Sequence, residues 1–183
     1  MRNILLPLCF SIVAPLAVAQ GVPQAAPPTV RAPDMLVGTV SLGDLQLLLD
    51  DMAAQLNSSG ANERGAPFVF ATSESGMSFG IYTACADEEA LDCRGVEFLA
   101  VFETDAPAET VNQLDSDYAA VSIYRSGPTT LNISRYVILD HGVTWANLLE
   151  NAAVFEVLCE RVGETLSEQA QKQLAEHAGP VPR

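Results

Sequence analysis

The stretch that decides the fold runs from Met77 to Glu103 and reads MSFGIYTACADEEALDCRGVEFLAVFE. Its two ends alternate apolar and other residues with a period of two, which is the pattern of strands that bury one face. An acidic turn over residues 86–92 separates them, so the two strands are predicted to form an antiparallel hairpin. The apolar positions are Met77, Phe79 and Ile81 in the first strand and Val96, Phe98, Ala100 and Phe102 in the second.

Cys85 and Cys93 flank the acidic turn, one beside each predicted strand. Facing positions on antiparallel strands hold their Cα atoms about 4.5–5.5 Å apart, which is within reach of a disulfide. The spacing therefore predicts a structural disulfide that closes the hairpin. A redox pair and half of a zinc site are the alternatives, although redox pairs usually have the tighter C-x-x-C spacing and zinc needs further ligands.

The first residues predict export. Arg2 precedes an apolar run from Ile4 to Leu16, which is too short to cross a bilayer, and Ala17-Val18-Ala19 has the small-x-small pattern of a cleavage site. We expect a signal peptide over residues 1–19, cleavage after Ala19, and a flexible Pro/Ala-rich linker over residues 20–35. Export also favours oxidation of the cysteine pair.

The chain is strongly acidic. It has 23 Asp and Glu residues against 9 Lys and Arg residues, which gives a formal net charge of −14 at pH 7. Such a charge repels nucleic acid and anionic lipid, and no segment after the signal peptide is apolar for long enough to insert into a membrane. The charge either serves solubility or attracts a basic partner or cations.

The remaining segments predict a domain over residues 36–166. Ser41 is a candidate N-cap of a first helix, with Asp44 as its reciprocal capping carboxylate and apolar positions that continue to Leu56. Asp105 is the candidate N-cap of a second helix. Further strands are expected at residues 68–70, 119–124 and 131–138.

The last predicted helix begins after Thr144, its candidate N-cap, and carries the most regular apolar stripe of the chain. The fold class is therefore α+β, with the order α-β-β-β-α-β-β-α and a twisted antiparallel five-stranded sheet packed with helices. Residues 167–183 are expected to form a polar helical extension and a loose tail. The stripe consists of Trp145, Leu148, Ala152, Phe155, Cys159, Val162 and Leu166.

The sequence has no catalytic, cofactor or metal-ligand motif, so no catalytic, cofactor-binding or metal-binding residue is assigned. His141 and His177 lack the neighbours that a metal site or a catalytic triad needs. An enzyme would have to use carboxylates such as Asp115 and Asp117. Cys159 is expected to be a small buried thiol, with an intermolecular bridge or a reactive thiol as the alternatives.

One face of the predicted sheet is the candidate binding face. It carries tyrosines and aliphatic side chains among small polar residues, which suits a contact surface better than a solvated one. We expect it to hold a peptide, a protein or a second copy of the chain; an ordinary amphipathic open face is the alternative. The candidate binding residues are Tyr82, Leu99, Val101, Tyr124 and Tyr136.

Several pieces follow one another in a distinctive order: residues 42–49, the strand-cysteine-turn-cysteine-strand unit from Tyr82 to Phe98, residues 102–105, Gly142-Val143-Thr144 with Asn147-Leu148, and the helix that follows. In this order, the segments resemble the YbjN-domain family over about residues 36–165. The second helix departs from the family pattern, because Val111 to Asp115 keeps the first asparagine of an Asn-x-Trp-Asn-like stretch but has neither its tryptophan nor its second asparagine.

The resemblance implies a fold similar to that of type III secretion chaperones, a twisted antiparallel sheet with helices. Proteins with this fold often self-associate. The family is described as bacterial sensory transduction regulators and supplies no catalytic residues. It also implies a Gram-negative source, so that the signal peptide would place the protein in the periplasm.

The function expected on these grounds is a non-enzymatic, exported binding or regulatory module for a peptide or protein partner, acting in sensory transduction or envelope stress. A homodimer is one expected form, and no cofactor is expected. A structural protein of envelope assembly and a carboxylate-based hydrolase are the alternatives.

Overall fold

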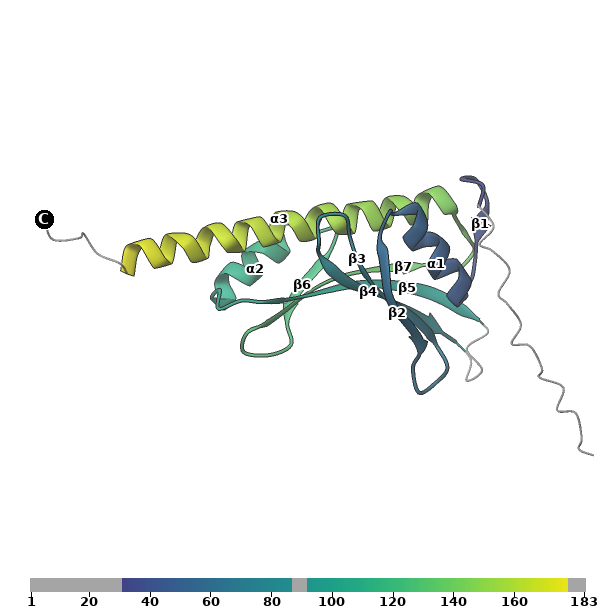
Figure 1. Cartoon of the computed structure of the whole chain (residues 1–183), viewed down its shortest axis with the longest axis horizontal. Coiled ribbons are helices and arrows are strands. Elements are labelled where there is room, and N and C mark those ends of the chain that lie inside the picture. The colour runs from purple at the N-terminus through teal and green to yellow at the C-terminus, as the bar shows by residue number, and fades with distance from the viewer. Residues whose placement is uncertain (1–30, 87–91, 178–183) are drawn as a thin grey trace, which may run out of the picture.

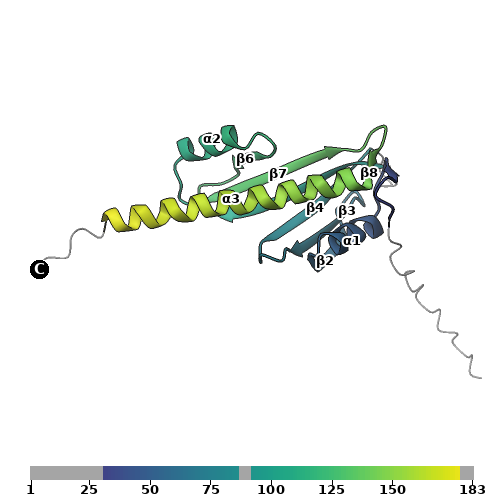
Figure 2. The same ribbon diagram turned by 90° about the horizontal axis from the view of Figure 1, so that it is seen from above.

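A computed structural model describes residues 31–86 and 92–177. Its centre is a six-stranded antiparallel sheet in the order β2-β3-β4-β5-β7-β6, so the fold is α+β. Helices α1 and α3 lie on one face of this sheet, and α2 packs beside β6 (Figures 1 and 2). In chain order the elements are β1 (Leu36–Val37), α1 (Leu42–Asp51), β2 (Gln55–Ala61), β3 (Pro67–Thr72), β4 (Ser78–Cys85), β5 (Cys93–Glu103), α2 (Ala108–Asp117), β6 (Ser122–Arg125), β7 (Thr130–Ile138), β8 (Val143–Thr144) and α3 (Trp145–His177).

The core lies between the sheet and the predicted apolar stripe of α3, every residue of which is buried. The ring of Phe155 lies 5.6 Å from that of Phe98 and 6.0 Å from that of Phe79, between centroids. Burying one such side chain stabilises the fold by about 1.5–3 kcal/mol. At the start of α3, the indole Nε1 of Trp145 donates to Asp51 at 2.7 Å, which joins this helix to α1.

The predicted number of five strands is wrong, because the sheet also contains β2 at its edge. The first helix ends at Asp51 and not at Leu56, since Ala53 adopts a left-handed φ of 54° that breaks the helix. The chain then reverses to pair with β3 over a segment that we expected to be the end of a helix followed by a loop. Pairing with a neighbouring strand overrides the low strand propensity of Asn57, Ser58 and Ser59.

Two of the three predicted helix caps are confirmed. Ser41 and Asp44 form a complete capping box at the start of α1, and Thr144 Oγ1 accepts the amide of Asn147 at 3.1 Å in α3. The prediction for Asp105 is wrong: α2 begins after Pro107, without a side-chain cap. Pro107 occupies the N-cap position, and its side chain has no acceptor for the amides of the first turn.

Helix α3 is 33 residues and about 50 Å long, and it includes the predicted polar extension as far as His177. No helix within the described ranges has the length and apolar content needed to cross a bilayer. The predicted signal peptide, its cleavage site after Ala19, most of the linker, the centre of the acidic turn and the last six residues lie outside the described residues.

Candidate binding face

The face of the sheet that points away from α1 and α3, called the open face below, is built from alternate residues of the strands. Directly paired residues on antiparallel strands point to the same side, so the pairing register arranges them in rows. One row contains Phe68, Tyr82, Glu97 and Tyr136. The next contains Ser58, Phe70, Gly80, Leu99, Ser134 and Ser122, and a third contains Val101, Asn132 and Tyr124.

The structure places all five predicted binding residues on the open face, spread over these three rows. Val101, Tyr124 and Tyr136 are 55%, 45% and 54% exposed, whereas Tyr82 and Leu99 are partly buried by their neighbours. The sheet therefore brings the predicted residues to one surface but does not gather them into one tight cluster.

The densest cluster on the open face includes two residues that sequence reasoning did not assign to it, Phe68 and Phe70. Their ring centroids lie 5.4 Å apart in an edge-to-face arrangement, and Tyr82 lies 6.1 Å and 5.8 Å from them, respectively. Such pairs favour each other by about 0.5–1.5 kcal/mol beyond the burial of their area. The alternation of Phe68 and Phe70 around buried Val69 was the signal in the sequence that could have placed them there. A run of three residues was too short to show which of them faces the core.

Glycines bring these aromatic rings close to the sheet. A β-carbon on Gly80 would lie only 2.8 Å from the Tyr82 ring, closer than real side chains approach. Because glycine has no side chain, the ring can occupy that space and lie over the backbone. The pairs of ring and glycine are Phe68 with Gly60, Tyr82 with Gly80, and Tyr136 with Gly95.

The charge on the open face has one sign. Glu97 and Glu103 lie on it by register, and no basic side chain of the described strands does. Partial burial, together with the nearby Glu97 carboxylate, raises the pKa of Tyr82. Its phenol therefore keeps its proton at neutral pH and can donate a hydrogen bond, beside a carboxylate that attracts cationic groups.

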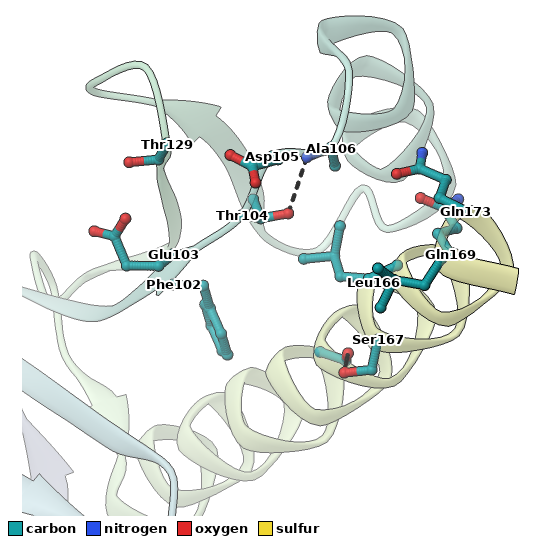
Figure 3. A pocket seen from close by; sticks show the side chains of 13 residues that line it. Phe102, Glu103, Thr104, Asp105, Ala106, Thr129, Leu166, Ser167, Gln169 and Gln173 are labelled. Atoms are coloured by element: carbon teal, nitrogen blue, oxygen red, sulfur yellow. Dashed lines mark hydrogen bonds between the residues drawn. The ribbon is translucent and has the colours of Figure 1, made fainter. Parts of the chain in front are cut away.

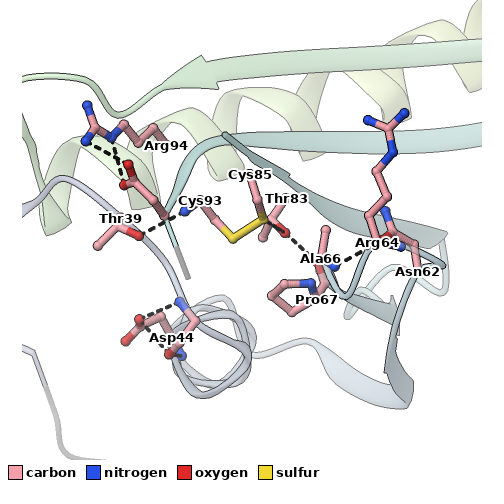
Figure 4. Close-up of a disulfide and its surroundings, with 12 residues drawn as sticks. Thr39, Asp44, Asn62, Arg64, Ala66, Pro67, Thr83, Cys85, Cys93 and Arg94 are labelled. Carbon is pink, nitrogen blue, oxygen red and sulfur yellow. Dashed lines mark hydrogen bonds and ion pairs between the residues drawn. A yellow bond between two sulfur atoms is a disulfide. The ribbon is translucent and has the colours of Figure 1, made fainter. Parts of the chain in front are cut away.

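The sulfur atoms of Cys85 and Cys93 lie at disulfide distance, 2.05 Å apart (Figure 4). Their Cα atoms are 3.7 Å apart, closer than expected for facing strand positions, and the pairing register shifts between Ala84 and Cys85. Cys93 is fully buried, and its amide donates to Thr39 Oγ1 at 3.2 Å. The amide of Val40 donates to the Cys93 carbonyl at 3.1 Å. The pair therefore joins β4 to β5, and Cys93 also bonds the segment that leads into α1. This is the position of a structural disulfide.

A groove of about 770 Å³ lies between α3 and the loop after β5 (Figure 3). Phe102 and Leu166 give it an apolar wall, and Asp105 lines it with a carboxylate. Its hydroxyl groups include Thr104, which accepts the amide of Ala106 at 3.1 Å, and Ser167, which donates to a backbone carbonyl of α3. Both hydroxyl groups are hydrogen-bonded to the nearby backbone, so this groove is better suited to binding than to catalysis.

The carboxylates, the free cysteine and the turn histidine considered in the sequence lie away from the open-face cluster or are held by local contacts. Asp115 accepts the amide of Ile123 at 2.8 Å, and Asp117 accepts the side-chain amide of Gln113 at 2.8 Å. Cys159 is fully buried, and this burial, with Glu156 and Glu160 nearby, raises the pKa of its thiol to about 12. His141 lies in a turn with a left-handed φ of 66°. Asp115 and Cys159 therefore have structural positions, in the β6 edge and in the core.

Within residues 31–86 and 92–177, no group of three or more His, Cys, Asp or Glu side chains could hold a metal ion. A comparison with models of known protein families finds no match for this chain, and a comparison with curated proteins finds none either.

Proposed function

We propose that this protein is a non-enzymatic, exported binding or regulatory module that holds an extended segment of a partner protein on its open face. The observation that carries the proposal is the cluster of Phe68, Phe70 and Tyr82, whose rings lie within 6.1 Å of one another on a face that α1 and α3 leave uncovered. Contiguous exposed aromatic and aliphatic side chains are typical of protein contact surfaces.

The charge of this face favours a basic partner. Glu97 and Glu103 are unopposed there by a basic side chain of the described strands, and the whole chain carries a formal net charge of −14. A segment with apolar and Lys or Arg side chains complements both features. A second copy of the chain would bring the same carboxylates and the same net charge, which disfavours a homodimer through this face.

The cellular compartment that we propose is the one that the sequence predicted. A predicted signal peptide and a cysteine pair at disulfide distance support export to an oxidising compartment, the periplasm. We also propose a YbjN-like domain, on the sequence resemblance alone; the α+β class with an antiparallel sheet is the class of fold that this resemblance implies. A role in sensory transduction or envelope stress follows from that resemblance.

Photo-crosslinking in the native host tests the proposal. A photoreactive residue at Ser58, which is exposed on the open face beside Phe70, is compared with one at Val157, which is 46% exposed on α3. We expect adducts from position 58 to carry segments with apolar and basic residues. Replacing Tyr82 and Tyr124 by serine in the same chain should remove these adducts.

Three results would contradict the proposal: equal adducts from both positions, adducts that survive the double substitution, or adducts only with a second copy of this chain. An envelope-assembly protein would instead fractionate with membrane or peptidoglycan and show no segment bound at position 58.

A further inference from the structure

The two edges of the six-stranded sheet differ. Strand β6 is only four residues long, and the outward amide of Ile123 is already bonded to the Asp115 carboxylate at 2.8 Å. A short edge with a capped amide is a common protection against pairing with another chain. Strand β2, at the other edge, is seven residues long.

Edge β2 has few such protections. All of its residues except Gly60 are exposed, and it contains no proline and no charged residue. It pairs with β3 on one side, and within the described residues no strand pairs with its other side. Alternate N–H and C=O groups of β2 therefore point outward, as a template for another strand. A register shift between Leu56 and Ser58 leaves the stretch from Ser58 to Ala61 regularly paired.

We propose that the partner segment adds to β2 as a seventh strand, with its apolar side chains on the open face. This inference rests on the proposed function and specifies where the ligand lies: beside the aromatic cluster, with β2, β3 and β4 between it and Glu97 on β5, so its basic side chains need acidic neighbours nearer to β2. Backbone hydrogen bonds to β2 supply affinity in such strand addition, and pockets for alternate side chains supply specificity.

The residues next to this edge suit that arrangement. On the open face, β2 presents Ser58 and Gly60, which are small, beside Phe70 and Phe68. The Phe68 ring reaches over Gly60, where a β-carbon would lie 2.9 Å from it. An apolar side chain of an added strand would therefore contact an aromatic ring directly.

The opposite side of the added strand has different neighbours. Exposed Asp50 lies at the end of α1, on the helix side of the sheet, and β2 begins five residues later, whereas the adjacent Asp51 already accepts the Trp145 indole. A strand that alternates apolar and basic residues would place apolar side chains against the aromatic cluster and basic ones toward the Asp50 carboxylate. The ligand class is thus an extended, alternating apolar and cationic segment.

The test uses the mature chain and an acetylated, amidated heptapeptide in which lysine alternates with valine or tyrosine. In a strand, the amides of alternate residues point to opposite edges. One version carries N-methyl groups on the apolar residues, and the other carries them on the inner lysines. Strand addition predicts that one version loses at least about tenfold in affinity while the other keeps most of it. The parent peptide should also slow amide hydrogen exchange in residues 55–61.

A matched pair of protein variants tests whether the peptide binds at the β2 edge. Ser58 and Ser122 lie on opposite edge strands in the same open-face row and are both exposed. Ser58→Lys adds a charge at the proposed edge that repels the cationic peptide, so the affinity for the parent peptide should fall by about tenfold. Ser122→Lys should change that affinity by less than about twofold.

The outcomes separate this inference from the proposed function. If both N-methylated versions bind like the parent and Tyr82→Ser removes binding, the open face binds without strand addition and this inference is overturned. Equal loss for both versions, with unchanged exchange in residues 55–61, overturns it as well. A parent peptide that does not bind at all contradicts the proposed function itself.

Discussion

The ring of Tyr136 covers Gly95, and a β-carbon on this glycine would lie only 2.6 Å from the ring carbon Cζ. Glycine is unfavourable inside a strand because it adds no packing and costs entropy. Its place in β5 is explained by the aromatic ring above it. The open face is therefore a surface in which missing side chains let rings lie close to the sheet.

The substitution Gly95→Ala tests this relationship. The added methyl group occupies the space of the Tyr136 phenol, so the ring must swing outward, and the free energy of unfolding should fall by about 1 kcal/mol. In a double-mutant cycle measured by urea unfolding, Tyr136→Ser should remove at least about 0.5 kcal/mol of that loss. Strictly additive losses would show that the ring does not rest on this glycine.

Asp115 should stabilise the β6 edge. Asp115→Ala leaves the amide of buried Ile123 without its acceptor, so it should lower the free energy of unfolding by about 1–2 kcal/mol. Asp117→Ala, in the same helix, removes only an exposed bond to Gln113 and should cost less than about 0.5 kcal/mol. Urea unfolding of both variants measures the difference, and equal losses would contradict the capping role.

The Cys159 thiol should be inert in the folded protein. It is fully buried and its pKa is raised to about 12, so both access and thiolate formation are suppressed at neutral pH. With the disulfide intact, a thiol reagent should label no cysteine of the mature protein in buffer and one in denaturant. Labelling of Cys159 in buffer at the rate of a free cysteine would mean that α3 does not pack against the sheet as described.

Glu156 should make stability depend on pH. Partial burial first, and Glu160 and Glu74 next, raise its pKa above the ordinary value of 4.5. Between 4.5 and this raised pKa the folded state binds more protons than the unfolded state, so the contribution of Glu156 to stability falls as pH rises through that window. Below the window the penalty disappears.

Glu156→Gln should therefore raise the unfolding midpoint in urea at pH 7 more than at pH 4. Glu164→Gln, at an exposed position of the same helix, is the control and should show little difference between the two pH values. A Glu156→Gln effect that is the same at both pH values would show that its carboxylate is not penalised by its surroundings.

Strong periodic patterns in the sequence predicted most of the fold. The stripe from Trp145 to Leu166 predicted a buried helix, and the alternation on both sides of Cys85 and Cys93 predicted the central hairpin. Strand β2 could not be predicted in this way, because Gln55 to Ala61 is polar and exposed and is held by pairing with β3. Its strand character depends on a neighbour and not on its own residues.

The open face was predicted in part for a related reason. Alternation placed Tyr82, Leu99 and Val101 opposite the core, but the short apolar run at Phe68 and Phe70 did not show how its rings would meet Tyr82. That contact depends on the register between β3 and β4, which the turn between them sets and the short apolar run alone does not.

The affinity of the alternating lysine-containing heptapeptide for the mature protein tests the central claim most directly. Calorimetric titration compares the wild type with Phe70→Ser/Tyr82→Ser on the open face and with Leu36→Ser/Val157→Ser, which removes two exposed apolar side chains elsewhere. We predict that the first variant raises the dissociation constant by about tenfold or more, equivalent to about 1.4 kcal/mol, and that the second leaves it within about twofold. A peptide that does not bind, or that binds the open-face variant as tightly as the wild type, would contradict the account.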